Sequence, residues 1–281
     1  MKRAAGFTLI ELLLVAVLVG VLAALGGLLV LKPVQAFGDQ ARRAALVDVA
    51  DLALGRISRE LRHALPNSVR VATSGGLVAL EFLQTTAGGR YRARPESDGS
   101  GDPLAPVLPD SFDVLGDLAA APVPGPAGAC GTPGGGDCLV IYNTGTGPGH
   151  FSAYRRDNVA SITAFAGGVM SLDNGAPWSW PFPIPADQGQ RFFVVRGPVS
   201  YVCDSTAGTL RRYAGYAIAD PQPLPPPGGG ALLADRVSGC AFSYQDGGPA
   251  ARRGLVTLDL SLTDAGETVR LVYQVHVLNM P

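Results

Sequence analysis

A long apolar run near the start of the chain constrains this sequence more than any other feature. It extends from Phe7 to Leu31, and its polar residues are Thr8 and Glu11. A helix of this length extends about 38 Å, which is more than the roughly 30 Å hydrocarbon core of a membrane. A carboxylate at the bilayer centre costs roughly 2.5 to 3.5 kcal/mol. Glu11 therefore needs a functional explanation.

Three interpretations of the run compete. Lys2 and Arg3 precede it, so the positive-inside tendency keeps the N-terminus in the cytoplasm and exports the rest. A cleaved secretory signal would end after Ala36, but its apolar region should be about 7 to 15 residues long. A plain signal anchor is the second interpretation. Neither of these two interpretations explains an acidic residue at position 11. The third interpretation is that a peptidase cleaves the chain between Gly6 and Phe7.

The stretch Gly6-Phe7-Thr8-Leu9-Ile10-Glu11, followed by the apolar run, resembles the type IV prepilin signature. Type IV pilins and the pseudopilins of type II secretion share this signature. The resemblance implies cleavage between Gly6 and Phe7 by a prepilin peptidase, N-methylation of Phe7, and assembly of a filament through N-terminal helices. It also implies a partner for Glu11, the Phe7 ammonium of a neighbouring subunit. Two charges are tolerated in an apolar interior when they pair.

A finer resemblance lies beyond the apolar run. The stretch "ARRAALVDVADLALGRISRELRHALPNSVRV", residues 41 to 71, resembles minor pilins of the MshO type from the mannose-sensitive haemagglutinin (MSHA) pilus, and PilW-type minor pilins more distantly. It implies a non-enzymatic structural subunit, without a cofactor, that initiates or caps pilus assembly together with other major and minor pilins. The subunit would cross the bacterial inner membrane once, with its C-terminal domain in the periplasm, and would then reach the pilus and the cell surface.

Two alternatives stay open. A minor pseudopilin of a type II secretion system would use the same mechanics in a different machine. A membrane-anchored extracellular binding module would use the long loops, or the aromatic stretch of residues 177–185, for carbohydrate or a surface. For that stretch, packing in the core or over the sheet is favoured over an exposed contact.

A second helical stretch follows, and Pro33 is expected to kink the helix or to end its membrane part. Apolar residues then recur at spacings of three and four, which is typical of an amphipathic helix that packs on a sheet. These residues are Ala50, Leu54, Ile57, Leu61 and Leu65. Pro66 is expected to stop the helix. The predicted organisation is a leader (1–6), a transmembrane and filament-core helix (7–31), an amphipathic helix (32–65) and a β-rich globular domain (66–281).

The remainder predicts strands and long loops. The candidate strands are 68–71, 77–83, 139–142, 192–196, 199–203, 210–213 and 240–244. Alternating apolar residues in 256–262 and 269–277, separated by Asp264-Ala265-Gly266, predict an antiparallel hairpin with one buried face. Gly/Pro-rich loops occupy 95–109, 122–137 and 220–230. The fold class is therefore α+β and pilin-like, with a long N-terminal helix packed on an antiparallel sheet.

Four cysteines lie beyond the apolar run, and an even number in an exported region favours two disulfides. We expect Cys130 to pair with Cys138, because these two bracket a short Gly/Pro loop that can bend back, and Cys203 to pair with Cys240. Four free thiols are the alternative. A zinc site is disfavoured because the cysteines lack two-residue ligand spacing and have no histidine nearby in sequence.

No pattern in the chain indicates catalysis. His63, His150 and His276 are isolated from one another in sequence, and residues 145–149 are typical of a turn rather than a phosphate loop. Two Asp/Asn/Gly-rich segments, 173–175 and 246–248, have calcium ligands but indicate tight turns first. The formal net charge of −1 provides no field that would attract a nucleic acid.

Overall fold

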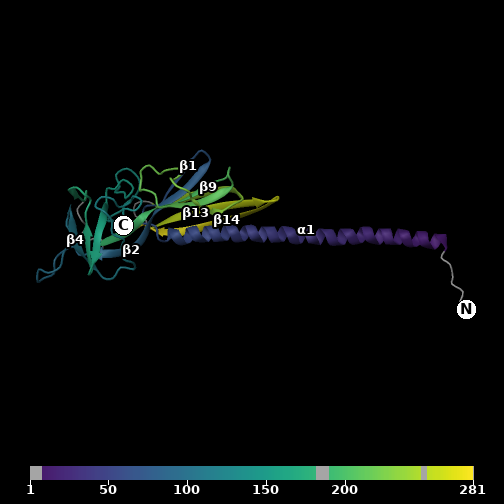
Figure 1. The fold of residues 1–281 in the computed structure, drawn as a ribbon, viewed down its shortest axis with the longest axis horizontal. Helices are drawn as coiled ribbons and strands as arrows, with labels where there is room; N and C mark the ends of the chain where they lie inside the picture. Colours follow the sequence, from purple (N-terminus) through teal and green to yellow (C-terminus); the bar gives the residue numbers. More distant parts are fainter. Residues whose placement is uncertain (1–7, 182–189, 248–251, 281) are drawn as a thin grey trace.

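A computed structural model describes residues 8–181, 190–247 and 252–280, without the side chains of residues 25 and 27–36. One long helix, α1 (Leu9–Leu61), extends from a β-rich body, and its N-terminal half projects away from that body (Figure 1). The architecture is α+β, as the sequence predicts. The body lies at the C-terminal end of the helix.

The course of α1 corrects two expectations. The helix is continuous for 53 residues, and Figure 1 shows no sharp bend along it, so the expected kink at Pro33 is absent. A proline removes one backbone hydrogen bond, and the many other bonds of a long helix hold the segment together. The helix ends at Leu61 and not at Leu65. The residues that follow Leu61 bond to strand β2 (Leu77–Tyr91) instead of continuing the helix. Leu65 N–H donates to the Leu83 carbonyl at 2.8 Å, and Ala64 forms an antiparallel β-bridge with Gln84.

The C-terminal part of α1 buries one face. The predicted stripe is almost completely inaccessible to solvent, and Leu46 and Ala53 extend it. This face packs against β14, β13 and β11. Leu52, which points away from the stripe, is 70% exposed. The amphipathic pattern thus fixes which side of α1 meets the body.

The described residues of the body form fourteen strands, and nine of them belong to one antiparallel sheet with the order β1-β2-β4-β7-β6-β5-β9-β10-β11. These strands are β1 (Arg70–Ser74), β2 (Leu77–Tyr91), β4 (Asp110–Leu115), β5 (Cys138–Val140), β6 (Val159–Ala166), β7 (Val169–Leu172), β9 (Arg191–Asp204), β10 (Thr209–Ala214) and β11 (Ala231–Ala234). A second sheet contains β12 (Val237–Gln245), β13 (Arg253–Asp264) and β14 (Glu267–Leu278). Two short strands, β3 (Val107–Leu108) and β8 (Trp178–Ser179), pair with each other.

The long strands β2 and β9 pair with each other and contribute to both apolar cores of the body described below. Because β2 also pairs directly with β9, the strands β2, β4, β7, β6, β5 and β9 close into a ring. A separate apolar core fills this ring and includes Tyr91, Phe112 and Phe192. Nearer to α1, the β1-β2-β9-β10-β11 part of the sheet shares another core with α1 and the three-stranded sheet.

Strand β9 joins two predicted strands into one. We expected separate strands at 192–196 and 199–203, but β9 runs through Gly197 and Pro198 without a break. Pro198 is aligned with Leu83, next to a register shift in β2 at Gln84 and Thr85. Proline occurs in sheets at such irregularities because it lacks the N–H group that a regular ladder uses.

The predicted terminal hairpin is present as β13 and β14. The side chains of Val256, Leu258, Leu260 and Leu262 are fully buried. Asp264 pairs with Glu267 across the turn, and both turn residues have positive φ angles, 48° at Ala265 and 88° at Gly266. A two-residue turn of this kind matches the twist of the two strands. This hairpin forms the surface on which α1 lies.

An ion pair fastens α1 to the larger sheet. The Glu60 carboxylate accepts hydrogen bonds from Arg212 Nε of β10 at 2.8 and 3.1 Å, and the two side chains are 18% and 19% exposed. Burial alone would raise the pKa of Glu60. The neighbouring Tyr201, Arg212 and Arg56 outweigh burial and lower this pKa below its usual 4.5.

We expect Glu60→Gln to reduce the free energy of unfolding by about 1 to 2 kcal/mol at neutral pH, because Arg212 loses its charged partner. A carboxyl group whose pKa is lowered on folding stabilises the protein above its unfolded pKa. The difference between wild type and variant should therefore shrink as the pH falls below 4.5. Urea unfolding at several pH values measures it. Asp259→Asn, which breaks the exposed pair with Arg270, is the control and should cost less than about 1 kcal/mol.

Candidate functional site

The free end of α1 carries the residues that the sequence singles out. Gly6 and Phe7 lie outside the described residues. Thr8 caps the helix, and its Oγ1 accepts a hydrogen bond from Glu11 N–H at 3.4 Å. Glu11 is exposed in the first helical turn, where a negative charge interacts favourably with the helix dipole. The Glu11 carboxylate makes no hydrogen bond or ion pair with the described residues.

Sequence reasoning missed one local signal at this end. Thr8 and Glu11 have the spacing of a capping box, in which the third helical residue reaches back to the backbone N–H of the capping residue. The structure forms the half of this motif in which Thr8 accepts, and Glu11 leaves its carboxylate unused. Glu11 therefore has two possible roles, helix capping and pairing with another chain, and these roles make different demands on its charge.

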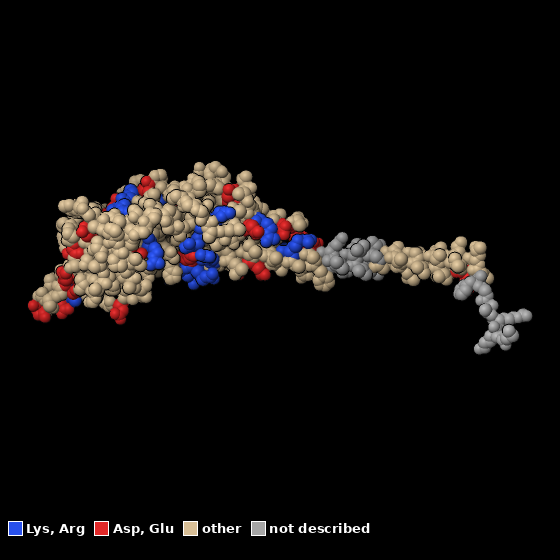
Figure 2. Space-filling view, in the orientation of Figure 1, with Lys and Arg blue, Asp and Glu red and all other residues tan. Residues whose placement is uncertain are grey.

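The free half of α1 presents apolar side chains on all sides. Its large apolar side chains between residues 9 and 22 are 48% to 85% exposed. They are Leu9, Ile10, Leu12, Leu13, Leu14, Val15, Val17, Leu18, Val19, Val21 and Leu22. In Figure 2 this part of the helix is uncharged except for an acidic spot near its end. A helix that is apolar all round is normally buried, so this surface requires cover from other molecules.

Small residues interrupt this apolar surface. Ala16, Gly20 and Ala24 follow one another at spacings of four and are exposed. A methyl group at Gly20 would meet nothing within 4 Å. Small residues in such a row let two helices approach closely.

Among the residues that the structure describes, no helix is both long and apolar enough to cross a membrane.

The two disulfides lie in the body and have the pairing favoured by the sequence. Cys130 is joined to Cys138, with the Cα atoms 5.2 Å apart, and Cys203 is joined to Cys240, with the Cα atoms 6.5 Å apart. The second bond connects β9 to β12 and thus ties the larger sheet to the three-stranded sheet. The disulfides therefore support the body and lie in a different region from the exposed end of α1.

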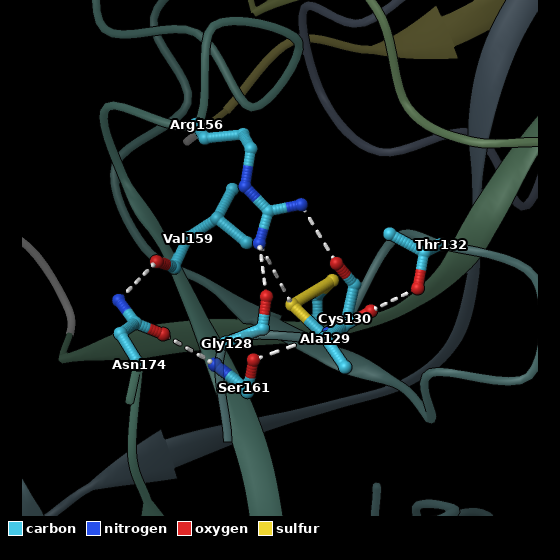
Figure 3. Close-up of a disulfide and its surroundings, with 9 residues drawn as sticks. Gly128, Ala129, Cys130, Thr132, Arg156, Val159, Ser161 and Asn174 are labelled. Atoms are coloured by element: carbon cyan, nitrogen blue, oxygen red, sulfur yellow. Dashed lines mark hydrogen bonds between the residues drawn. A yellow bond between two sulfur atoms is a disulfide. The ribbon is translucent and has the colours of Figure 1, made fainter. Parts of the chain in front are cut away.

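The Cys130–Cys138 bond sits in a network of backbone contacts (Figure 3). Arg156 Nη1 donates to the Cys130 carbonyl at 2.7 Å, and Arg156 Nη2 donates to the Gly128 carbonyl at 3.4 Å. The Cys130 N–H donates to Ser161 Oγ at 3.2 Å. Both cysteines are fully buried. This network orders the Gly/Pro loop of residues 122–137, which composition alone marks as irregular.

We expect alkylation of the folded, exported protein without reductant to label none of the four cysteines. Replacing Cys203 and Cys240 together by alanine should lower the free energy of unfolding by about 2 to 4 kcal/mol, because the unfolded chain gains freedom. Denaturant titration measures the loss. The double variant keeps the Cys130–Cys138 bond, so dithiothreitol should cost wild type more stability than it costs the double variant, and this difference controls for the cavity left by the sulfur atoms.

The larger sheet also contains a buried charged network that the sequence did not reveal. Glu81 is fully buried, and Arg70 donates to its Oε1 from Nη2 at 2.5 Å and from Nε at 2.8 Å. Glu81 Oε2 accepts from Ser200 Oγ at 2.9 Å and from the Tyr216 hydroxyl at 2.6 Å. The guanidinium of Arg70 lies 3.5 Å from the centre of the Tyr154 ring. Burial, together with the charge of Glu81, raises the pKa of both Tyr154 and Tyr216.

The other sequence candidates have structural roles or lie apart. Asn174 donates to the Val159 carbonyl and accepts from Ser161 N–H, and Asp173 accepts from Gly175 N–H, so residues 173–175 form a turn that is held internally. The structure does not bring the three histidines together, and no group of side chains in the described parts of the chain is suited to holding a metal ion. Trp180 is buried and Trp178 half-buried, as expected for packing, whereas Phe182 lies outside the described residues.

Residues 1–27 match the prokaryotic N-terminal methylation motif. No curated protein and no solved structure matches the chain. With the α+β fold and the bare apolar helix, this motif indicates a subunit of the type IV pilin or pseudopilin class. The motif implies processing by a prepilin peptidase, anchoring in the inner membrane before assembly, and assembly with other pilins.

Proposed function

We propose that this chain is a minor subunit of a type IV pilus of the MSHA type that initiates or caps the filament. The observation that carries the proposal is the methylation motif at the head of a helix whose apolar surface is bare from Leu9 to Leu22. Burial of this surface provides the driving force for assembly, since each 100 Å² removed from water contributes about 2.5 kcal/mol.

Processing creates the positively charged group that we propose as the partner of the Glu11 carboxylate. Cleavage between Gly6 and Phe7 leaves a new ammonium group on Phe7, which is then methylated and keeps its positive charge. Glu11 becomes the fifth residue of the mature chain, and its carboxylate is not engaged within the described part of the subunit. A neighbouring subunit's Phe7 ammonium would neutralise it. Such a pair fixes the axial register between subunits, because any other register leaves both charges unpaired in an apolar interior.

The body supports a role at the end of a filament rather than along its length. It is a large domain with two main sheets, a closed ring of strands and long connections, and it lies at the end of α1 opposite the apolar tip (Figure 1). A terminal subunit needs neighbours on one side only, so a wide body does not disturb a helical repeat. The resemblance of residues 41–71 to MSHA minor pilins agrees with this role.

Deletion of the gene, together with an epitope-tagged copy, tests the proposal. We expect the number of pili per cell to fall at least about tenfold without the subunit, and pilus number to recover when the tagged copy is expressed. The tagged protein should occur in sheared pili at a small fraction of the major subunit. Unchanged pilus number, with loss of protein secretion instead, would assign the chain to a type II secretion system.

A further inference from the structure

A pocket of about 880 Å³ opens on the body between the 146–157 loop and the short strand β8. It includes residues from three separate parts of the chain, among them Phe151, Arg156, Trp178 and Asp220. These residues belong to the part of the body remote from the free tip of α1 (Figure 1). Filament assembly through α1 would therefore leave this pocket accessible. A cavity of this size holds a ligand of two or three saccharide rings.

One wall of the pocket is aromatic and rigid. Trp178 packs edge-to-face on the buried Trp180, with the ring centres 4.7 Å apart. Phe151 packs on Tyr142, with the ring centres 5.9 Å apart. The face of an aromatic ring carries partial negative charge, and it attracts the polarised C–H groups of a saccharide ring. Because the two Trp rings already support each other, a ligand would not have to order them.

Some polar side chains of the pocket hold its loop in place, and others have hydrogen-bonding groups without a partner in the described chain. Arg155 is fixed by Asp157 at 3.1 Å and by the Thr146 carbonyl at 3.2 Å, and it also donates to the His150 carbonyl. These bonds hold the loop in shape. The His150 ring and the Ser179 hydroxyl, by contrast, make no hydrogen bond within the described chain. Both are therefore available to the hydroxyl groups of a ligand.

Arg156 gives the pocket a positive charge without a carboxylate partner among the described residues. Its guanidinium donates to the Cys130 and Gly128 carbonyls, which are neutral acceptors, and the side chain is half-buried. Burial lowers the pKa of Arg156, as expected for a charge that lacks compensation. Asp220 is engaged elsewhere, at 3.5 Å from Arg70. A guanidinium has five N–H donors, and those that Arg156 does not use favour a carboxylate.

We propose that this pocket binds a carboxylate-bearing saccharide, with a sugar ring against Trp178, its carboxylate toward Arg156, and its hydroxyl groups bonded by His150 and Ser179. This inference does not depend on the pilus assignment, since any exported protein with this body would have the same site. It makes the body a receptor for acidic polysaccharides, such as those of a capsule, a plant cell wall or an extracellular matrix.

Isothermal titration calorimetry on the full chain in non-ionic detergent tests the proposal. The probes are a galacturonate trimer and a glucuronate-containing hexasaccharide, each compared with a neutral oligosaccharide of equal length. We expect at least one acidic probe to bind about tenfold more tightly than its neutral counterpart, with the difference decreasing at high salt. Equal affinity for acidic and neutral probes, or no binding of either acidic probe at millimolar concentration, would overturn the proposal.

Variants locate the site. Trp178→Ala and Arg156→Gln should each weaken binding about tenfold or more, and Arg156→Lys should retain part of the preference for acidic probes. Arg253→Gln removes an exposed guanidinium at the start of β13, outside the pocket, and should bind like wild type. Thermal unfolding of each variant separates loss of binding from loss of folding, and His150→Ala, at an exposed side chain, provides a second pocket variant. Binding that survives in Trp178→Ala, Arg156→Gln and His150→Ala alike would place the ligand elsewhere and contradict the proposal.

Discussion

Glu11→Ala should leave the chain in the membrane and processed, but should remove it from filaments. The substitution deletes one partner of the proposed pair and leaves the Phe7 ammonium of the neighbouring subunit unpaired in an apolar interior. Breaking a buried pair in this way costs about 3 to 5 kcal/mol, which corresponds to a loss of incorporation of at least about 100-fold. Quantitative immunoblots of sheared pili and of membrane fractions measure incorporation and insertion separately.

Glu11→Gln separates the two roles that the structure permits for this residue. Glutamine serves a capping box as glutamate does, but it carries no charge. If Glu11 pairs with an ammonium, Glu11→Gln should fail to assemble like Glu11→Ala. If capping of Thr8 is its role, Glu11→Gln should assemble normally, and the pairing hypothesis is then wrong. Asp48→Asn, at an exposed acid on the same helix, is the matched control and should assemble like wild type.

Glu81→Ala should destabilise the body by about 3 to 5 kcal/mol, because Arg70 is only 12% exposed and would lose its closer and more buried carboxylate partner, keeping Asp220 at 3.5 Å. Ser200 and Tyr216 would also lose their common acceptor. This is the largest loss of stability that we expect from a single change of a charged residue here. Urea denaturation followed by circular dichroism measures it.

A double variant shows whether the pair itself is stabilising. Arg70→Met combined with Glu81→Leu removes both charges and keeps the volume, so it should recover most of the stability lost in Glu81→Ala. Asp264→Asn, which breaks a more exposed pair with Arg236, should cost less than about 1 kcal/mol. If Glu81→Ala proves no more harmful than Asp264→Asn, the network does not have the structural role described here.

The features that were predictable from the sequence are those set by neighbouring residues. The stripe from Ala50 to Leu61 has the helical period, and the β13–β14 hairpin has strict alternation and a turn with two positive φ angles. The methylation motif is equally local, since it is contained within residues 1–27. Each of these signals lies within one stretch of chain, so no knowledge of distant contacts is needed.

Features that depend on register between distant strands were missed. Arg70, Glu81 and Ser200 face one another because β1, β2 and β9 align these residues in one row. In each strand alone, the charged or polar side chain suggests a solvent-exposed face. Glu81 is buried because chain segments near Tyr154 and Tyr216 cover that face, and no local pattern encodes their position. The ring of strands was missed for the same reason, since its closure depends on the pairing of β2 with β9.

Mass spectrometry of the mature N-terminus, on protein recovered from sheared filaments, tests the central claim most directly. We expect the N-terminal peptide to begin at Phe7 with a methylated amine. A chain that begins at Phe37, after removal of a secretory signal, or one that retains Met1 would contradict assignment to the pilin class.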